Sequence, residues 1–255
     1  MTDVNIQVQG ATHVGMVRSV NQDSYFIDKS KKVYIVADGM GGHAGGEVAS
    51  KMCTEKVFEY LEKKLFADEQ DSQSTDGIIG RRLAEAINYS STAIFEKSLE
   101  NPALKGMGTT STAIIIDQND GYVAHVGDSR LYLIRCGYIY QLTEDHSFVT
   151  EQLKAGLITE EEAEIHKMKN IITRSVGYQE EEEVDTHHFK LIKDDYILIC
   201  SDGLHGKVSC SEIAEIVVKE GTASVNSLID LANKNGGEDN ITAVVLKVTG
   251  NGEAS

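Results

Sequence analysis

The chain has 255 residues, of which 41% are hydrophobic, with one proline and no tryptophan; this suits one large globular domain better than two small ones. It carries 24 Lys and Arg against 40 Asp and Glu, a formal net charge of -16. Such a surface repels nucleic acid and anionic membranes and attracts cations and basic protein segments. We therefore expect neither nucleic acid nor membrane as a partner.

The cysteines and the N-terminus indicate the cellular compartment in which the protein works. The four cysteines lie far apart and form no C-x-x-C pair, the pattern of reduced thiols in a cytosolic protein. The first ten residues are polar, and no apolar run approaches the ~20 residues that cross a bilayer. We expect a cytoplasmic monomer without a targeting segment or membrane anchor.

The first predicted elements are one strand and two helices. VYIVA at 33–37 is a β-branched run too short for a buried helix, so it predicts a buried strand. Helical periodicity follows at 47–66 and 78–99, and the polar stretch at 67–77 joins the two helices. A dinucleotide-binding fold needs a second strand after its first helix, so this order excludes that fold.

A glycine-rich turn, DGMGGHAGGE, connects the first strand to the first helix. It matches the relaxed dinucleotide fingerprint G-x-G-x-x-A, but Asp38 and Glu47 flank the place where a phosphate would sit. Repulsion argues against a bare phosphate there. The P-loop pattern fails because Glu47 and Val48 stand where Lys and Ser or Thr are required. A metal ion would supply the missing positive charge.

Three further β-branched runs follow the helices. Two compact turn signals, DQNDG and Cys136-Gly137, predict antiparallel pairing between the strands that they join. This pattern favours an α+β fold over a wound parallel sheet. The runs are STAIIID at 111–117, YVAHV at 122–126 and LYLIR at 131–135.

The segment 147–170 breaks the strand pattern with short amphipathic helical pieces, and we interpret it as an insertion over the sheet. Two strands, YILIC at 196–200 and ITAVVLKV at 241–248, then enclose a pair of helices. A capping box of Ser209 and Glu212 is expected to begin the first of these helices. We expect one domain over residues 1–250 and a disordered tail at 251–255.

Asp recurs beside the predicted strands, at Asp38, Asp128, Asp202 and Asp239. Any one of them, next to glycine or another turn residue, is ordinarily a turn signal. Four together favour a different interpretation, because carboxylates that converge at strand ends repel one another unless a cation or proton neutralises them. Oxygen ligands alone indicate a hard ion, Mg²⁺ or Mn²⁺.

Eight segments, taken in chain order, resemble the metal-dependent serine/threonine protein phosphatases of type 2C, the PPM family, in its compact bacterial form. Each segment alone is a modest signal, whereas eight in sequence are highly specific. They are VRSVNQDSYF at 17–26, VADGMGGHAGGE at 36–47, GTTSTA at 108–113, AHVGDSRLYLIR at 124–135, LTEDHS at 142–147, ITRSVG at 172–177, ICSDGL at 199–204 and GGEDNITAVV at 236–245.

The resemblance implies a four-layer αββα fold: two central antiparallel sheets sandwiched between pairs of helices, with a flap at about 147–170. It also implies a binuclear Mg²⁺ or Mn²⁺ centre. Asp38 would bridge the two ions and the carbonyl of Gly39 would bind one of them. Asp202 and Asp239 would complete the other, and Asp128 together with Asp202 would hold a possible third ion.

Among the catalytic residues that the resemblance implies, Arg18 would bind the substrate phosphate and Asp23 would orient a water. Two positions depart from the family pattern. Met40 stands where eukaryotic members have a histidine proposed as the general acid, so we consider His43 as the acid instead, with a water on the metal as the alternative. Gln22 replaces the common Glu, which predicts looser metal binding.

The function that follows is metal-dependent hydrolysis of phosphoserine and phosphothreonine in proteins, opposing a bacterial serine/threonine kinase. His146 and Arg174, within two of the motifs, are expected to support the site. Two alternatives share the fold: an inactive scaffold, and a phosphatase dedicated to one regulator such as an anti-sigma antagonist. A cysteine-dependent phosphatase is excluded because no cysteine begins a C-x₅-R motif.

Overall fold

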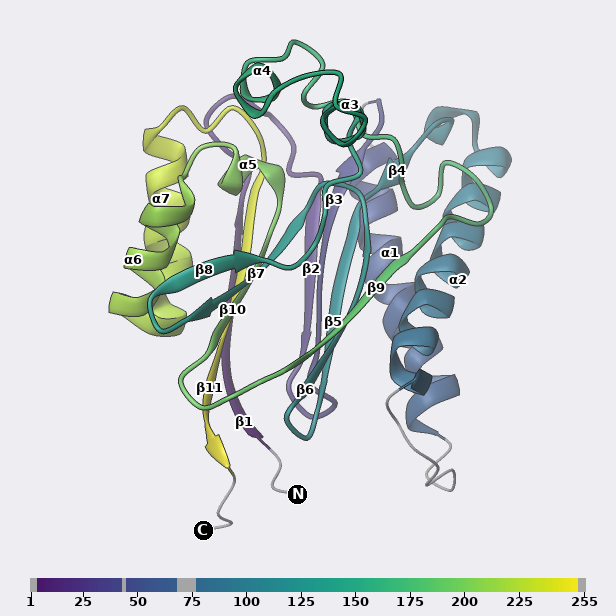
Figure 1. Ribbon diagram of the computed structural model, residues 1–255. Helices are drawn as coiled ribbons and strands as arrows, with labels where there is room; N and C mark the ends of the chain where they lie inside the picture. Colours follow the sequence, from purple (N-terminus) through teal and green to yellow (C-terminus); the bar gives the residue numbers. More distant parts are fainter. Residues whose placement is uncertain (1–3, 43–44, 68–76, 252–255) are drawn as a thin grey trace.

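The computed structural model describes residues 4–42, 45–67 and 77–251. Two antiparallel sheets face each other at the centre, with one pair of helices outside each sheet (Figure 1). The predicted α+β sandwich is therefore confirmed. His43 and the tail residues 252–255 lie outside the described residues. In the described part, no helix combines the length and the apolar character needed to cross a bilayer.

The first sheet has five strands in the order β1-β11-β10-β7-β8, all paired antiparallel. Helices α6 and α7 cover its outer face (Figure 1). The strands are β1 (Val4–His13), β11 (Ile241–Asn251), β10 (Tyr196–Cys200), β7 (Arg130–Arg135) and β8 (Tyr138–Gln141), and the helices are α6 (Cys210–Glu220) and α7 (Ser224–Lys234).

The second sheet has six strands, in the order β2-β3-β5-β6-β9 with the short β4 paired to β3. Helices α1 and α2 cover it, and α1 continues into a π-helical turn at Glu62–Phe66. The strands are β2 (Asp23–Asp28), β3 (Val33–Met40), β4 (Gly108–Thr109), β5 (Ser111–Asp117), β6 (Asp120–Val126) and β9 (Asp185–Lys190), and the helices are α1 (Gly45–Leu61) and α2 (Ile78–Glu100).

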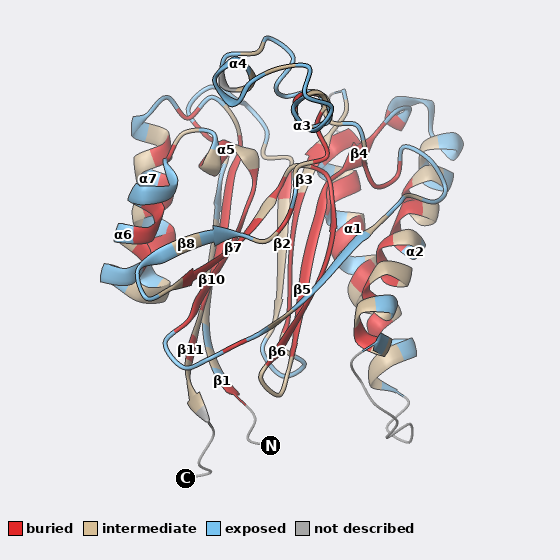
Figure 2. Ribbon diagram, in the orientation of Figure 1, coloured by how far each residue is buried: buried red, intermediate tan, exposed pale blue. Residues whose placement is uncertain are grey.

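The central strands are buried on both faces, which explains their continuous apolar runs (Figure 2). Along β3, Val33 and Ile35 pack toward α1 and α2, whereas Tyr34 and Val36 pack into the layer between the sheets. Strand β10 alternates in the same way, with Leu198 facing the α6–α7 side. Three apolar layers thus hold the four structural layers together.

Most of the predicted elements are confirmed, with small shifts at their ends. The turn at Cys136 and Gly137 has φ values of 53° and 81° and joins the antiparallel pair β7 and β8. The capping box at Ser209 and Glu212 is present, and α6 ends before Gly221, whose φ is 64°. Strands β1, β2, β4, β8 and β9 are not among the predicted elements. Of these, β1, β8, β2 and β9 are the edge strands of the two sheets, and β4 has two residues.

The segment 147–170 forms two short helices, α3 (Phe148–Lys154) and α4 (Glu160–Glu164), as predicted. A backbone bridge between Ser147 and Ile172 closes this segment on itself. Figure 1 shows α3 and α4 beyond the ends of the sheets, on the side of α5 (Asp202–His205). We call residues 147–170 the flap.

The ion pair between Arg135 and Asp195 provides a stability test. The Asp195 side chain is 1% exposed and accepts bonds from Nε of Arg135 at 2.8 Å and from its Nη2 at 2.7 Å. Replacing Arg135 with Met should lower the free energy of unfolding by about 2–4 kcal/mol, because a buried carboxylate loses its counter-charge.

Urea unfolding in the presence of a chelator would measure this effect. The control is Lys97→Met, which removes the exposed pair between Lys97 and Glu100 and should change the free energy by less than about 0.5 kcal/mol. If the two substitutions lowered the free energy of unfolding equally, Asp195 would not be a buried carboxylate that depends on Arg135 for its counter-charge.

Candidate metal centre and active site

Five carboxylates come from the ends of strands at the flap end of the sandwich. Asp38 lies in β3, and Asp23 pairs directly with it in the β2–β3 ladder. Asp128 follows β6, Asp202 opens α5 after β10, and Asp239 precedes β11. The two sheets thus contribute acids that lie far apart in the sequence.

Burial and the charges of neighbouring acids raise the pKa values of four of these carboxylates, Asp23, Asp38, Asp128 and Asp202. Burial, followed by the charges of the other four carboxylates, raises the pKa of Asp38 well above its ordinary value of 3.8. Burial is also the largest cause for Asp23 and Asp128, whose pKa values rise to about 7, and for Asp202, whose pKa rises to about 6. A cation would relieve this repulsion.

Two buried oxygens in the cluster have no hydrogen-bond partner within the described residues: Oδ1 of Asp23 and Oδ1 of Asp202. Oδ2 of Asp23, by contrast, accepts bonds from the hydroxyls of Ser201 and Thr242, both at 2.7 Å. Buried polar atoms are normally satisfied, so these orphaned oxygens suit ligands of an ion or of its waters. Because every donor is oxygen, the cluster fits Mg²⁺ or Mn²⁺.

The side chains as they stand do not yet enclose an ion. Across residues 4–42, 45–67 and 77–251, no three His, Cys, Asp or Glu side chains form a metal-holding group. Asp239 is engaged elsewhere, since its Oδ2 accepts a 2.7 Å bond from Nη2 of Arg18. Arg18, with 53% of its side chain exposed, is thus the counter-charge of one of the predicted metal ligands.

Two glycines allow the acid-bearing segments to pack closely. A Cβ on Gly39 would lie 2.0 Å from the carbonyl oxygen of Gly46, at the start of α1. A Cβ on Gly203 would lie 2.0 Å from the carbonyl oxygen of Asn240. Any side chain at either position would push the Asp38 or Asp202 turn away from its neighbour, so glycine is required by close backbone approach.

Asn240 is a site residue that the sequence analysis missed. Its Nδ2 donates to the carbonyls of Val14 and Val20, at 2.9 and 3.0 Å, and its Oδ1 accepts from the backbone N–H of Gln22 at 2.7 Å. One amide therefore holds both ends of the loop that carries Arg18. The signal in the sequence is only its position next to Asp239, because the bonds join residues more than 200 positions apart.

His146 has the supporting contacts that were expected of it. Its ring Nδ1 accepts a hydrogen bond from the backbone N–H of Gly127 at 3.1 Å, and the backbone N–H of His146 donates to the carbonyl of Gly127 at 2.8 Å. These bonds hold the residue just before Asp128. Arg174 pairs with Asp185 on β9, at 3.0 Å between Nη1 and Oδ1.

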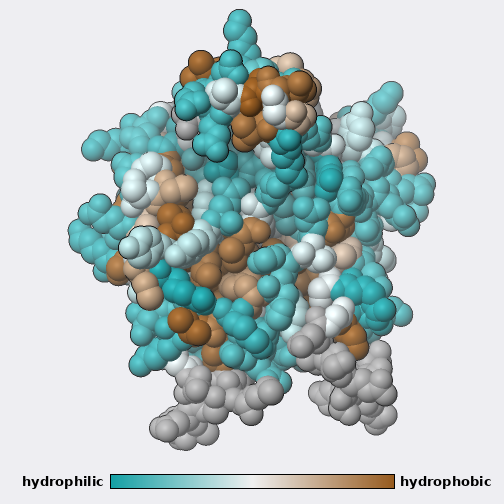
Figure 3. Space-filling model, in the orientation of Figure 1, coloured by the Kyte–Doolittle hydropathy of each residue, from teal (hydrophilic) through white to brown (hydrophobic). Residues whose placement is uncertain are grey.

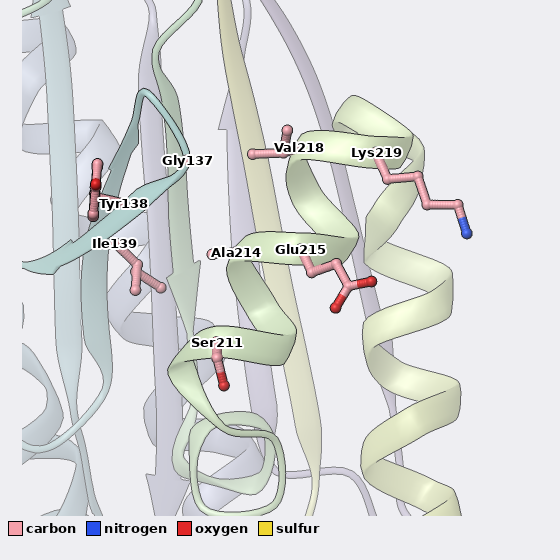
Figure 4. A pocket seen from close by; sticks show the side chains of 8 residues that line it. All are labelled: Gly137, Tyr138, Ile139, Ser211, Ala214, Glu215, Val218 and Lys219. Carbon is pink, nitrogen blue, oxygen red and sulfur yellow. The ribbon is translucent and has the colours of Figure 1, made fainter.

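A cleft of about 910 Å³ runs between the acids and the flap. One wall includes Arg18, Asp128, Asp202 and Asp239; the other includes flap residues such as Val149, Leu153 and Lys169. A second hollow, of about 710 Å³, lies between the β7–β8 hairpin and α6 (Figure 4). Its acidic lining residue is Glu215, which extends away from the hairpin, so the chemistry belongs to the first cleft.

The raised pKa values predict that the metal-free protein loses stability as the pH rises. In the folded state Asp38, Asp23 and Asp128 keep protons at pH values where unfolded carboxyls, with a pKa of 3.8, have lost them. The free energy of unfolding therefore falls with rising pH. Between about pH 6 and pH 9 the fall should be about 1–3 kcal/mol larger for the natural chain than for Asp38→Asn.

Urea unfolding in EDTA at each pH would measure both profiles. Burial lowers the pKa of His125 and of His205 to about 4, which gives the opposite slope at low pH, and this contribution cancels in the comparison. Parallel profiles would show that Asp38 holds no extra proton in the folded state.

The chain has recognisable relatives. Residues 9–242 match the family model of protein phosphatase 2C. Protein phosphatase PhpP of Streptococcus pneumoniae is 36% identical over 249 residues, which are 95% of this chain and 98% of the relative.

Two solved structures share the fold. The serine/threonine phosphatase Stp1 from Staphylococcus aureus superposes with a TM-score of 0.86 and 34% identity, covering 98% of this chain and 97% of that one. The catalytic domain of the serine/threonine protein phosphatase PstP, in complex with two manganese ions, has a TM-score of 0.81 and 36% identity, covering 96% of this chain and 99% of that one. Together with the eight motifs, these similarities show that the chain belongs to the protein phosphatase 2C family and is a protein phosphatase.

Proposed function

We propose that this protein hydrolyses phosphoserine and phosphothreonine in other proteins with two Mg²⁺ or Mn²⁺ ions and opposes a bacterial serine/threonine kinase. The observation that carries the proposal is a set of five carboxylates at one end of the sandwich, two of which have an orphaned buried oxygen. Three of the five, Asp128, Asp202 and Asp239, line the cleft opposite the flap. The two manganese ions bound to the related PstP domain support the number of ions.

The proposal assigns the ligands as the family motifs do. Asp38 would lie between the two ions, the carbonyl of Gly39 would bind one, and Asp202 and Asp239 would bind the other. Asp128 with Asp202 would hold a third. When bound, the ions supply a water activated for attack on phosphorus and positive charge that offsets the charge on the phosphoryl oxygens.

Arg18 supplies positive charge beside the acids in addition to that of the bound ions. Its planar guanidinium matches two phosphate oxygens at once. In the structure that guanidinium binds Asp239, so a substrate phosphate would compete with this carboxylate for the same donors. Arg18 is therefore placed to exchange an internal partner for the substrate.

Asp23 is held in one orientation by its neighbours. Because Ser201 and Thr242 both donate to Oδ2, Oδ1 remains available to accept a hydrogen bond from a water. This leaves Asp23 as the residue that orients the attacking water. The proton for the departing alcohol has no side-chain source at Met40, since a thioether cannot donate one, and His43 stays our candidate for that role.

The flap forms the outer wall of the cleft and carries apolar side chains on its surface. Figure 3 shows hydrophobic atoms gathered over this segment. Exposed members are Leu157 and Ile165, with Met168 less so. We assign the flap to the recognition of the protein chain around the phosphorylated residue, because such contacts leave the acids and Arg18 unaffected.

The test of the proposed reaction is hydrolysis of a phosphothreonine peptide and of p-nitrophenyl phosphate with Mn²⁺, Mg²⁺ or EDTA. Turnover should require a divalent ion, and Asp38→Asn or Asp202→Asn should lower kcat at least about a hundredfold, because each removes a charge from the ion-holding cluster. Circular dichroism would check that each variant is folded. Turnover in EDTA, or none with either ion, would contradict the proposal.

Arg18→Ala should act mainly on substrate binding. We expect KM for the peptide and the inhibition constant of inorganic phosphate to rise about tenfold or more, with a smaller fall in kcat. Arg18→Lys, which keeps the charge but loses the planar fork, should lie between Ala and the natural chain. If both constants stay unchanged in Arg18→Ala, the guanidinium serves Asp239 alone.

A further inference from the structure

His205 is the last residue of α5, the single helical turn that Asp202 opens. Residues three apart lie on the same face of a helical turn, and Asp202 and His205 both line the cleft. Nε2 of His205 lies 3.0 Å from the backbone carbonyl oxygen of Asp128, which lines the same cleft. A side chain from one acid-bearing turn thus contacts the backbone of another.

The tautomer of His205 follows from this contact. A carbonyl oxygen only accepts hydrogen bonds, so Nε2 must carry the hydrogen. Burial keeps the pKa of His205 low, at about 4, and the neutral ring has one N–H, which leaves Nδ1 without a hydrogen. The ring therefore donates to Asp128 as a neutral group and adds no charge to the cluster.

The turn that carries Asp128 is held by hydrogen bonds on both sides. Gly127 exchanges two bonds with His146, as described above. On the other side, the carbonyl of Ser129 accepts from the hydroxyl of Thr112 at 3.1 Å. The turn joins β6 of the second sheet to β7 of the first, and Arg130 of β7 pairs with Cys200 of β10, which leads into α5. The bond from His205 thus adds a side-chain tie between two turns whose adjoining strands are paired.

This tie acts between two acids that repel each other. After burial, the charge of Asp202 is the largest cause that raises the pKa of Asp128. Repulsion between the two carboxylates favours separation of their turns, and the bond from His205 opposes it. The separation of two carboxylates decides whether one ion can bind both of them.

We propose that His205 is a positioning residue that sets the spacing between Asp128 and Asp202 and thereby the affinity of the ion that these two carboxylates share. The inference rests on the proposed function in one respect, that the carboxylates bind divalent ions. The bond of a neutral donor contributes modestly, so its loss should weaken that ion about five- to tenfold and leave the ions held by Asp38 and Asp239 nearly unchanged.

Mn²⁺ binding, measured by calorimetry and electron paramagnetic resonance without substrate, tests this role. Four variants are compared with the natural chain: His205→Phe removes the donor, His205→Gln keeps an amide donor, Asp128→Ala removes the ligand, and His187→Phe changes an exposed histidine on β9. We expect His205→Phe to weaken about five- to tenfold the binding of the Mn²⁺ that Asp128→Ala affects most, which identifies the ion shared by Asp128 and Asp202. His205→Gln should recover most of that affinity, and His187→Phe should match the natural chain.

A second readout needs no metal. The ¹⁵N chemical shifts of His205 should report a neutral ring with its hydrogen on Nε2, and amide exchange at residues 127–129 should be faster in His205→Phe than in His205→Gln. The positioning role would be overturned if His205→Phe left the affinity of the shared Mn²⁺ unchanged, if it weakened all ions equally, or if His205→Gln recovered none of the affinity. If the natural chain binds no Mn²⁺, the proposed function fails instead, so the two failures are distinguishable.

Discussion

The repulsion among carboxylates at one end of the sandwich is the constraint on which the rest of this structure depends. The charges of four other acids raise the pKa of the single residue Asp38. Side chains that repel one another stay together only if the backbone leaves them no alternative, and the free energy comes from apolar burial elsewhere. The site is thus stabilised by residues that take no part in its chemistry.

The frame that supplies this rigidity is the three-layer apolar core. Because β3 and β10 are buried on both faces, a slip of either strand by one residue would move every side chain into the apolar layer on the opposite face, where it would not fit the packing. The register places Asp23 opposite Asp38, and Gly39 and Gly203 bring the turns within backbone contact. Polar ties such as the Asn240 side chain then orient the loop that carries Arg18.

The doubly buried strands, the helices and the acids at the strand ends were accessible from the sequence, since each has a local pattern. Strand β1 also has one, because Val4, Ile6 and Val8 alternate with polar residues, but its polar composition hides it. Strand β9, DTHHFK, is an exposed edge strand with no apolar alternation to read.

The parts of the site that escaped prediction depend on contacts distant in the sequence. Ser201 and Thr242 donate to Asp23, and His205 donates to the backbone of Asp128; none of these bonds has a signature within its own segment. Nor does composition reveal that Arg18 pairs with Asp239. Such pairings follow from the way the sheets bring strand ends together, which no local pattern contains.

The bridge between Ser147 and Ile172 has an evolutionary consequence. The chain leaves and re-enters the body of the protein at one point, so residues inserted or lost between these two positions alter neither sheet's ladder. Natural selection is therefore free to vary the length and composition of this excursion while the acids keep their places. Paralogues within one cell could in this way acquire different clients without rebuilding the chemistry that they share.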